Sequence, residues 1–240
     1  MKNLFIVGAQ RSGSSLLRDL LDQHESVSMA RPFNPEPKYF LNKSPLDKDE
    51  YKSIYFQNIS NDTIYLAEKS TSYFESKFAA ENIYKNFPKS KILIILRSPA
   101  ERTWSNYKFS KLNNIENLDF SEAIKPESEN RKSSEFSVNP FAYVSRSKYE
   151  NFLKIYQEIF SPEEIKILIF EEFIKDSSGS ELFEWLGIDN KKINAEFKIN
   201  SSNSEDLPIS HKTQLQEEFS QTIQYVENLI GREINPWREL

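Results

Sequence analysis

The side chains and spacing best suited to chemistry lie in one short stretch near the N-terminus, residues 8–15, GAQRSGSS. Gly8 and Gly13 have the G-x-x-x-x-G spacing of a Walker A loop, and Ser15 stands where that loop places its magnesium-binding hydroxyl. The lysine that should precede this hydroxyl is absent, and the cation of the stretch is Arg11. Backbone amides at a helix N-terminus still attract an anion. The stretch therefore predicts a site for a phosphate-bearing nucleotide, held differently than in an ATPase.

A second basic residue follows the most apolar segment of the chain, residues 91–96, KILIIL. Such a segment is typical of a strand in the middle of a parallel sheet. In magnesium-dependent P-loop enzymes, a second strand leads to an aspartate that helps hold the metal. Here the strand leads to Arg97, whose charge would repel magnesium and attract an anion. Ser105, two turns into the next expected helix, would place a hydroxyl near the same anion. Both anchors favour a nucleotide whose phosphates are neutralised by side chains.

Strands and helices alternate around these two anchors. The apolar pattern predicts strands at 3–7, 27–29, 64–67, 91–96 and 165–170. It predicts helices at 13–23, 49–57, 77–86, from Pro99 onward, and at 143–160, 180–186 and 211–230. Residues 31–45 contain four prolines and are expected to be irregular. The alternation predicts an α/β, P-loop-like three-layer fold with a central parallel sheet, helices on both faces, and ligands at the carboxyl ends of the strands.

Length and composition limit the classes of function. The 240 residues suit a single domain, 1–240, with a polar, mobile insertion at about 113–139 that holds one short helix near 120–124. A net charge of −5 argues against a nucleic-acid binder. The chain lacks cysteine and has two distant histidines, which argues against a metal site. Neither a signal peptide nor a membrane-spanning segment is recognisable, so a cytoplasmic protein is expected.

In their order along the chain, these motifs resemble the sulfotransferases that use 3′-phosphoadenosine 5′-phosphosulfate (PAPS). Residues 10–16, QRSGSSL, are similar to the loop that binds the 5′-phosphosulfate, and residues 97–107, RSPAERTWSNY, to the 3′-phosphate motif. Residues 36–40, EPKYF, and 68–74, EKSTSYF, resemble motifs of the heparan sulfate and other carbohydrate sulfotransferases, which are closest in motif order. Further segments in family order are SKY at 147–149, ILIFEEF at 167–173, WLG at 185–187, LIGR at 229–232, and Trp237.

The chain departs from the heparan sulfate type at two positions. Arg11 stands where those enzymes usually have lysine, although arginine occurs there in branches that resemble tyrosylprotein sulfotransferases. Thr71 stands where the motif usually has proline. Neither departure changes the expected reaction class, but both leave the acceptor open.

The resemblance implies transfer of a sulfuryl group from PAPS, with 3′,5′-adenosine bisphosphate (PAP) as the nucleotide product and no metal. The residues implied to hold the 5′-phosphosulfate are Gln10, Arg11, Ser12, Gly13, Ser14 and Ser15. Arg97 and Ser105 would bind the 3′-phosphate. Arg11 would also neutralise the charge that develops on the leaving phosphate.

The resemblance also supplies candidates for the chemistry at the acceptor. Glu36 is the first choice for the general base, and His24 is the alternative. Lys69 would stabilise the transferring group, unless it forms a structural ion pair with Glu68 or another acid. Glu68 is interpreted as structural. Residues that could assist in binding nucleotide or acceptor are Tyr149, Lys212 and Arg232.

The acceptor and two other function classes remain open from the sequence. An acidic chain favours a neutral or lightly charged sugar, oligosaccharide or glycolipid over a dense polyanion, and a small alcohol or phenol is an alternative. Neither O- nor N-sulfation nor the oligomeric state is indicated. A P-loop kinase of a small molecule, using ATP, is the main alternative enzyme. A non-catalytic nucleotide-binding module is the third hypothesis, although it would not need Glu36 and Lys69.

Overall fold

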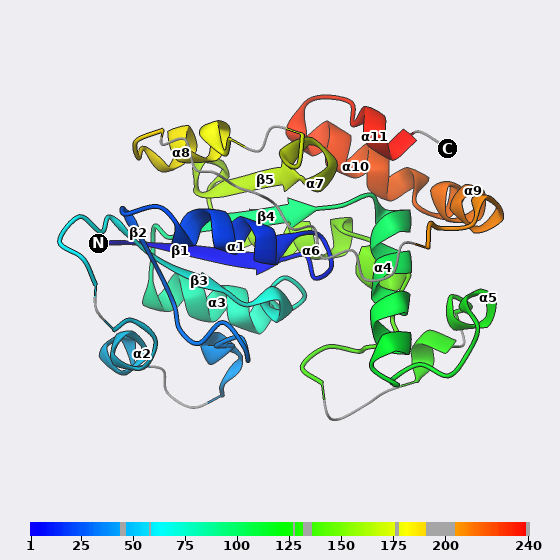
Figure 1. Cartoon of the computed structure of the whole chain (residues 1–240), viewed down its shortest axis with the longest axis horizontal. Coiled ribbons are helices and arrows are strands. Elements are labelled where there is room, and N and C mark those ends of the chain that lie inside the picture. The colour runs from blue at the N-terminus through cyan, green and yellow to red at the C-terminus, as the bar shows by residue number, and fades with distance from the viewer. Residues whose placement is uncertain are drawn as a thin grey trace. The chain divides into compact units, whose positions relative to one another are not determined.

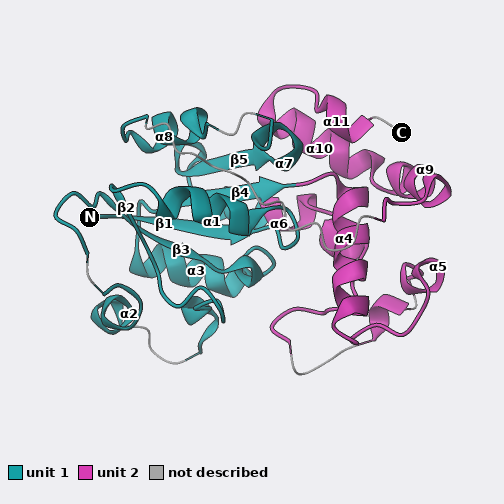
Figure 2. Ribbon diagram, in the orientation of Figure 1, with its two compact units in different colours: residues 1–96, 154–199 teal, residues 97–153, 200–240 magenta. Residues whose placement is uncertain are grey.

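A computed structural model describes residues 1–43, 47–57, 59–126, 128–131, 136–175, 178–190 and 205–238. The chain divides into two compact units, shown in separate colours in Figure 2. Unit 1 comprises Met1–Leu96 and Lys154–Ile199, and unit 2 comprises Arg97–Leu153 and Asn200–Leu240. The first boundary falls between the strand at 91–96 and Arg97, so the two predicted phosphate anchors belong to different units.

Unit 1 is built on a five-stranded sheet in which every pair of neighbours is parallel (Figure 1). The strand order is β2-β3-β1-β4-β5. The strands are β1 (Lys2–Gly8), β2 (Val27–Met29), β3 (Tyr65–Lys69), β4 (Lys91–Leu96) and β5 (Ile165–Ile169). Ile6 of β1 is in register with Lys69 of β3, so the chain leaves these two strands at the same edge of the sheet. This edge carries the predicted nucleotide loop.

Both faces of the sheet are covered, as the continuous apolar runs predict. On one face, Leu4 and Ile6 pack with Leu17 of α1 (Ser14–Asp22) and with α8 (Ser180–Leu186). Phe5 lies between them in sequence and therefore points to the other face. There its ring contacts Phe40 and also Phe87, the residue that ends α3 (Lys77–Asn86). The predicted three-layer α/β fold is thereby confirmed.

The remaining helical segments of unit 1 are short. They are α2 (Lys48–Tyr55) and α7 (Phe170–Phe173), with 3-10 turns η1 (Tyr39–Leu41), η2 (Thr71–Tyr73) and η5 (Pro162–Glu164). α6 (Glu150–Ile159) crosses from unit 2 into unit 1. The four-proline segment contains only the turn η1 among its described residues, in agreement with the expected irregular structure.

Unit 2 is helical, and its aromatic core forms around α4 (Pro99–Leu112). Trp104 and Tyr107 of α4 pack with Phe120, the first residue of α5 (Phe120–Ala123), and with Phe219 near the C-terminal helices. The further helices are α9 (Ile209–Glu218), α10 (Ser220–Ile230) and α11 (Asn235–Arg238), with 3-10 turns η3 (Ser128–Asn130) and η4 (Ser145–Ser147). The expected helix from Pro99 and the short helix near 120–124 are both present.

The expected helix at 211–230 is confirmed in its extent, but one residue divides it into two helices. Phe219 leaves helical geometry, with φ −97° and ψ 8°, and separates α9 from α10. Its ring is fully buried in the core of unit 2, where it packs with Leu215. The amide of Phe219 still donates to the carbonyl of Leu215, and that of Ile223 to the carbonyl of Phe219, both at 2.9 Å, so the break is confined to one residue.

The expected helix at 143–160 is wrong in its first part, because α6 begins only at Glu150. The carbonyl of Tyr143 accepts hydrogen bonds from the hydroxyls of Thr103 (3.3 Å) and Ser147 (3.2 Å). The Ser147 amide donates instead to Val144, three residues back, at 2.9 Å. Side-chain donors thus replace the backbone bond of an α-helix, and a 3-10 turn results.

The predicted insertion at 113–139 is described only in part. In the described part of the predicted insertion 113–139, buried Glu116 accepts hydrogen bonds from Arg131 at 2.9 and 2.7 Å. The mobility of this insertion and the single-domain boundary 1–240 stay predictions.

Candidate active site

The predicted nucleotide loop connects β1 to α1 through two left-handed residues. Arg11 has φ 69° and Gly13 has φ 91°. Side-chain-bearing residues rarely adopt this region, and those that do are frequent at ligand sites. Gly13 is the N-cap of α1 and has no side chain with which to cap it. The first amides of α1 therefore have no intrahelical acceptor and point out of the helix end, as an anion site requires.

Close packing explains why both loop positions 8 and 13 are glycine. A β-carbon on Gly8 would lie 2.6 Å from Cβ of Phe74, and one on Gly13 would lie 2.4 Å from Cδ2 of Phe170. Both distances are shorter than van der Waals contact. The side chains of Phe74 and Phe170 thus pack directly against the loop backbone at these two positions.

Ser12 contributes a second sign that the loop is built for a ligand. Its side chain is fully buried, and its Oγ has no hydrogen-bond partner within the part of the chain that the structure describes. Buried hydroxyls in native proteins are almost always hydrogen-bonded. A buried, unpaired hydroxyl between Arg11 and the start of α1 fits a loop whose remaining partner is a bound anion.

Glu36 and Lys69, distant in sequence, meet beside this loop. Lys69 Nζ donates to Glu36 Oε1 at 2.7 Å and lies 3.5 Å from Oγ of Ser15 in the first turn of α1. Thr71 donates its amide to Glu36 Oε2 at 2.9 Å, and its hydroxyl lies 3.1 Å from both carboxylate oxygens. The side chains of Lys69 and Glu36 are 7% and 15% exposed. The carboxylate is thus oriented by several donors but remains in reach of solvent.

This arrangement can do acid–base chemistry on an anion. The carboxylate can accept a proton from an approaching hydroxyl or amine, and the ammonium can neutralise negative charge near the helix N-terminus. Thr71 is the residue whose role sequence reasoning missed. Its departure from the usual proline was visible, and threonine, unlike proline, supplies an amide and a hydroxyl donor to Glu36.

Glu68 is a neighbour of Lys69 in sequence but not its ion-pair partner. Successive residues of a strand point to opposite faces. Glu68 is buried on the aromatic face, where it accepts hydrogen bonds from Tyr51 (2.6 Å) and Ser70 (2.7 Å). Burial raises the pKa of its carboxyl above the ordinary value. The structural interpretation of Glu68 therefore agrees with its contacts.

His24, the alternative base, has both ring nitrogens engaged. The Ser26 amide donates to Nδ1 at 3.1 Å, which leaves the proton on Nε2, and Nε2 lies 2.9 Å from the carbonyl oxygen of Asp189. The ring is buried and packs against Phe183. With its acceptor nitrogen occupied by a backbone amide, His24 is placed as a structural residue.

The other predicted anchor lies in unit 2, at the start of α4. Arg97 is 3.2 Å from the carboxylate of Glu101, one turn further, and Ser105 follows one turn later on the same helix face. The hydroxyl of Tyr149 donates to the carbonyl of Arg97 at 2.8 Å, so Tyr149 positions the backbone there. Burial, and next the charge of Arg97, lower the pKa of Lys108. Its ammonium donates to the carbonyl of Glu205 at 2.7 Å.

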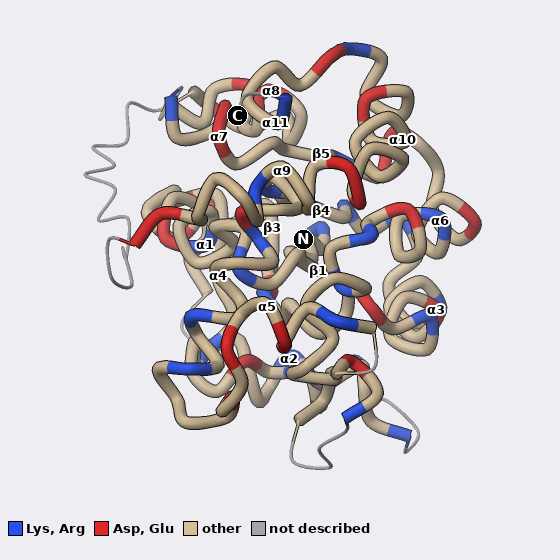
Figure 3. Tube along the Cα trace, turned by 90° about the vertical axis from the view of Figure 1, so that its right-hand side faces the viewer, with Lys and Arg blue, Asp and Glu red and all other residues tan. Residues whose placement is uncertain are grey.

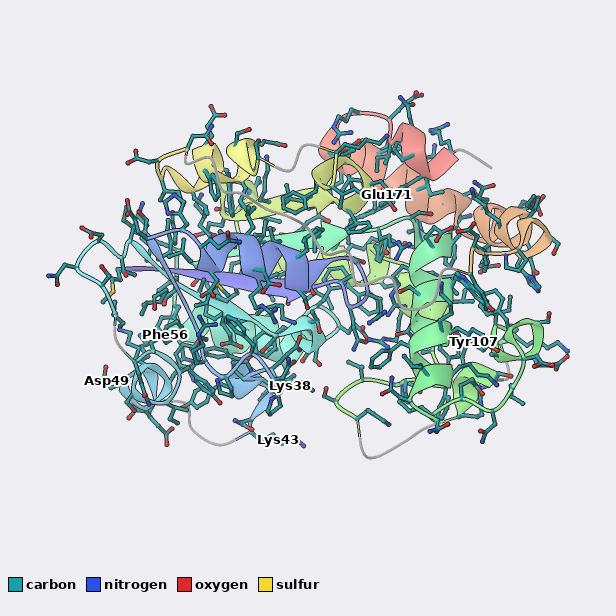
Figure 4. The ribbon with its side chains drawn as sticks, in the orientation of Figure 1. Lys38, Lys43, Asp49, Phe56, Tyr107 and Glu171 are labelled. Atoms are coloured by element: carbon teal, nitrogen blue, oxygen red, sulfur yellow. The ribbon has the colours of Figure 1, made fainter. Side chains whose placement is uncertain are left out.

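The two remaining basic candidates are also in unit 2. Lys212 is half-buried on α9, and Arg232 is exposed just after α10. No described contact gives either residue a ligand-binding role, so both stay predictions. Figure 4 shows the side chains of both units, with Tyr107 of α4 and Glu171 of α7 among those labelled.

Comparison with known proteins identifies the family. The family model described as "Sulfotransferase domain" matches residues 1–228 of the chain. The chain belongs to the sulfotransferase family. The match includes the loop at 8–15, the Glu36–Lys69 pair and the Arg97–Ser105 segment.

Individual relatives of this sulfotransferase agree with the family. It is 28% identical over 199 residues to bifunctional heparan sulfate N-deacetylase/N-sulfotransferase 1 of Caenorhabditis briggsae, covering 78% of this chain and 23% of the relative. The chain is also 32% identical over 112 residues to bifunctional heparan sulfate N-deacetylase/N-sulfotransferase 1 of Homo sapiens, covering 45% of this chain and 13% of the relative. The chain thus spans less than a quarter of the length of these curated relatives. A sulfotransferase structure from Alicyclobacillus acidocaldarius superposes with a TM-score of 0.82 at 24% identity, covering 100% of this chain and 99% of that one, and shows the shared fold.

Family membership makes the protein a sulfotransferase enzyme. Among the helices of the described residues, none is both long and apolar enough to cross a membrane.

Proposed function

We propose that this enzyme transfers a sulfuryl group from PAPS to a hydroxyl or amine of a carbohydrate acceptor, with Glu36 as the general base. The observation that carries the proposal is the contact of Glu36 with Lys69 and Thr71 beside Ser15, at the open N-terminus of α1. A phosphate-binding loop alone would serve a simple nucleotide-binding module. A clamped, partly exposed carboxylate at the same loop supports catalysis.

PAPS fits the residues present in the loop. The open amides of α1 and the buried, unpaired Ser12 hydroxyl offer donors to the 5′-phosphosulfate, with Gln10, Arg11, Gly13, Ser14 and Ser15. Arg97 and Ser105 are assigned to the 3′-phosphate from the motif resemblance. When bound, PAPS supplies an activated sulfuryl group attached to a phosphate that can leave. Metal independence is part of the proposal, because Arg11 takes the place of the Walker lysine and Arg97 that of the metal-binding acid.

Each charged residue then has one task. Glu36 accepts the acceptor's proton on a carboxylate oxygen, which makes the acceptor oxygen or nitrogen nucleophilic. Lys69 neutralises negative charge next to Ser15, and Arg11 neutralises charge on the leaving phosphate oxygen. Transfers of this kind pass through loose transition states, so orientation and charge neutralisation provide most of the acceleration.

A carbohydrate acceptor is proposed from the relatives and the charge pattern. The curated relatives are named as heparan sulfate N-sulfotransferases, so an amine acceptor is as compatible as a hydroxyl. Basic and acidic residues are interspersed along the described chain in Figure 3, and the net charge is −5. This pattern favours a neutral or lightly charged sugar, oligosaccharide or glycolipid over a dense polyanion. A cytoplasmic location remains part of the proposal.

The test separates donor binding from the kinase alternative. We expect PAP to raise the melting temperature in the presence of a metal chelator, because binding to the native state stabilises it. Arg97→Ala should reduce this shift, whereas Lys125→Ala, which removes a cation of unit 2 paired with the exposed Glu122, should leave it nearly unchanged. Stabilisation by Mg-ATP alone would refute the proposal. Transfer of radiolabelled sulfate to a panel of sugar acceptors would then identify the acceptor and exclude a non-catalytic module.

A further inference from the structure

A buried network of hydroxyl groups lies on the side of β3 opposite to Lys69. Its centre is Glu68, a residue that is only 1% exposed. The hydroxyls of Tyr51 and Ser70 donate to this carboxylate at 2.6 and 2.7 Å. Burial, and then the charge of this carboxylate, raise the pKa of the Tyr73 hydroxyl. The carboxylate thus acts on three hydroxyl groups, one from α2 and two from the segment at 70–73.

Two of these hydroxyls also hold the segment that carries Glu36. Ser70 Oγ accepts a hydrogen bond from the amide of Lys38 at 3.0 Å, and the Tyr73 hydroxyl accepts one from the amide of Phe40 at 3.1 Å. Lys38, labelled in Figure 4, precedes the turn η1. Tyr51 contacts this segment through its ring, whose centroid lies 5.1 Å from that of Phe40. Its hydroxyl donates to Glu68.

The direction of these hydrogen bonds depends on a negative acceptor at the centre. A hydroxyl has one proton to donate and two lone pairs with which to accept. When the proton is directed to a carboxylate, the lone pairs face away from it and can accept a backbone amide. An ionised carboxylate has about four acceptor positions and no donor, so it can orient three hydroxyls at once. An amide side chain in its place would present two N–H donors to the same hydroxyls.

We propose that Glu68 is a positioning residue for Glu36, acting through the hydroxyls of Ser70 and Tyr73. The proposal rests on the proposed function, in which Glu36 is the base. Pro35 and Pro37 flank Glu36 and restrict its backbone, so fixing the amides at 38 and 40 also fixes the carboxylate.

The two neighbours Glu68 and Lys69 therefore support Glu36 from opposite sides of one strand. Lys69 contacts the Glu36 carboxylate directly, and Glu68 holds the backbone that follows it. Burial, and then the charge of Glu68, raise the pKa values of Tyr51 and Tyr73 well above the ordinary value. Both tyrosines therefore keep their protons, and Tyr51 donates its proton to Glu68.

The experiment compares two matched substitutions, Tyr73→Phe and Tyr51→Phe. Each removes from a buried ring one hydroxyl on which the charge of Glu68 acts, but only Tyr73→Phe also removes the acceptor of a loop amide. We expect Tyr73→Phe to lower kcat about tenfold to a hundredfold, as a small displacement of a catalytic group does. Its KM for the donor and its affinity for PAP should stay close to wild type. Tyr51→Phe should leave kcat within about twofold of wild type.

Hydrogen exchange read by NMR at the Lys38 and Phe40 amides provides a readout that is independent of activity. Tyr73→Phe should speed exchange at Phe40 by about fivefold to tenfold, as the loss of one hydrogen bond allows, and Tyr51→Phe should not. Ser70→Ala should speed exchange at Lys38 and also lower kcat, which keeps the test available if one tyrosine variant folds poorly.

Equal losses of kcat in the two tyrosine variants would overturn the proposal, as would unchanged exchange in Tyr73→Phe and Ser70→Ala. Failure of PAP to stabilise the wild-type protein would refute the proposed function instead. Hydrogen exchange would still show in that case whether the network holds the loop.

Discussion

Replacement of Gly13 by alanine tests the shape of the nucleotide loop. The backbone there has φ 91°, and a β-carbon would lie 2.4 Å from Cδ2 of Phe170. A left-handed conformation costs a residue with a β-carbon about 1–2 kcal/mol, and forcing an extra methyl group into a packed site costs about 1–3 kcal/mol. Gly13→Ala should therefore lower the free energy of unfolding by about 2–5 kcal/mol.

Two other glycines of unit 1 separate the conformational cost of an alanine from the cost of its collision with a neighbouring ring. Gly187 has φ 66°, and nothing lies within 4 Å of the position that an alanine methyl group would take, so Gly187→Ala should cost only the conformational share, about 1–2 kcal/mol. Gly8 lacks a positive φ but would place its β-carbon 2.6 Å from Cβ of Phe74, so Gly8→Ala should cost about 1–3 kcal/mol through the collision.

Urea unfolding followed by fluorescence gives these free energies, and a double-mutant cycle with Phe170→Ala isolates the collision. Removal of the ring should make the cost of Gly13→Ala approach that of Gly187→Ala. PAP should also stabilise the Gly13→Ala variant less than wild type, because its loop amides shift. A cost equal to that of Gly187→Ala in the intact protein, or no coupling to Phe170, would refute the reasoning.

Three further substitutions test the other assigned residues. Glu36→Gln should abolish turnover and leave the affinity for PAP nearly unchanged, as measured by sulfate transfer and calorimetry; a parallel loss of affinity would contradict its role as base. Tyr149→Phe should weaken PAP binding about threefold to tenfold, because the Arg97 carbonyl loses its donor, and should leave kcat at saturating donor unchanged. Hydrogen bonding from Arg238 holds the pKa of Glu227 below its ordinary value, so the native state is stabilised above that value and loses this contribution as the pH falls through the lower native pKa. The melting temperature of Glu227→Gln should therefore fall less than that of wild type between about pH 5 and pH 3, and identical slopes would contradict the assignment.

Much of the fold could be predicted because its strands are read from local pattern. The segment KILIIL is apolar on both faces, which only a covered parallel strand needs, and the structure places it as β4. The helix at 143–160 was predicted incorrectly at its start, because a side chain distant in sequence decides that position. The hydroxyl of Thr103 donates to the Tyr143 carbonyl, which a helix would use for a backbone hydrogen bond.

The candidate site was predictable in its residues but not in its contacts. Motif order was sufficient to select Arg11, Glu36 and Lys69 from a chain of 240 residues. Nothing in that order could choose between an ion pair of Lys69 with its neighbour Glu68 and one with Glu36. The alternation of a strand sends neighbours to opposite faces, so the partner of Lys69 came from a loop 33 residues earlier.

The sequence by itself determined the class of fold, the family motifs and the chemical types available at the loop, because local periodicity and residue chemistry are properties of short segments. Only the tertiary structure decided that Thr71 donates to Glu36 and that both nitrogens of His24 are engaged. It also decided that Glu68 accepts from Ser70, whose oxygen accepts the amide of Lys38. Hydrogen bonds are directional and act over about 3 Å, so they depend on which segments the folded sheet brings together.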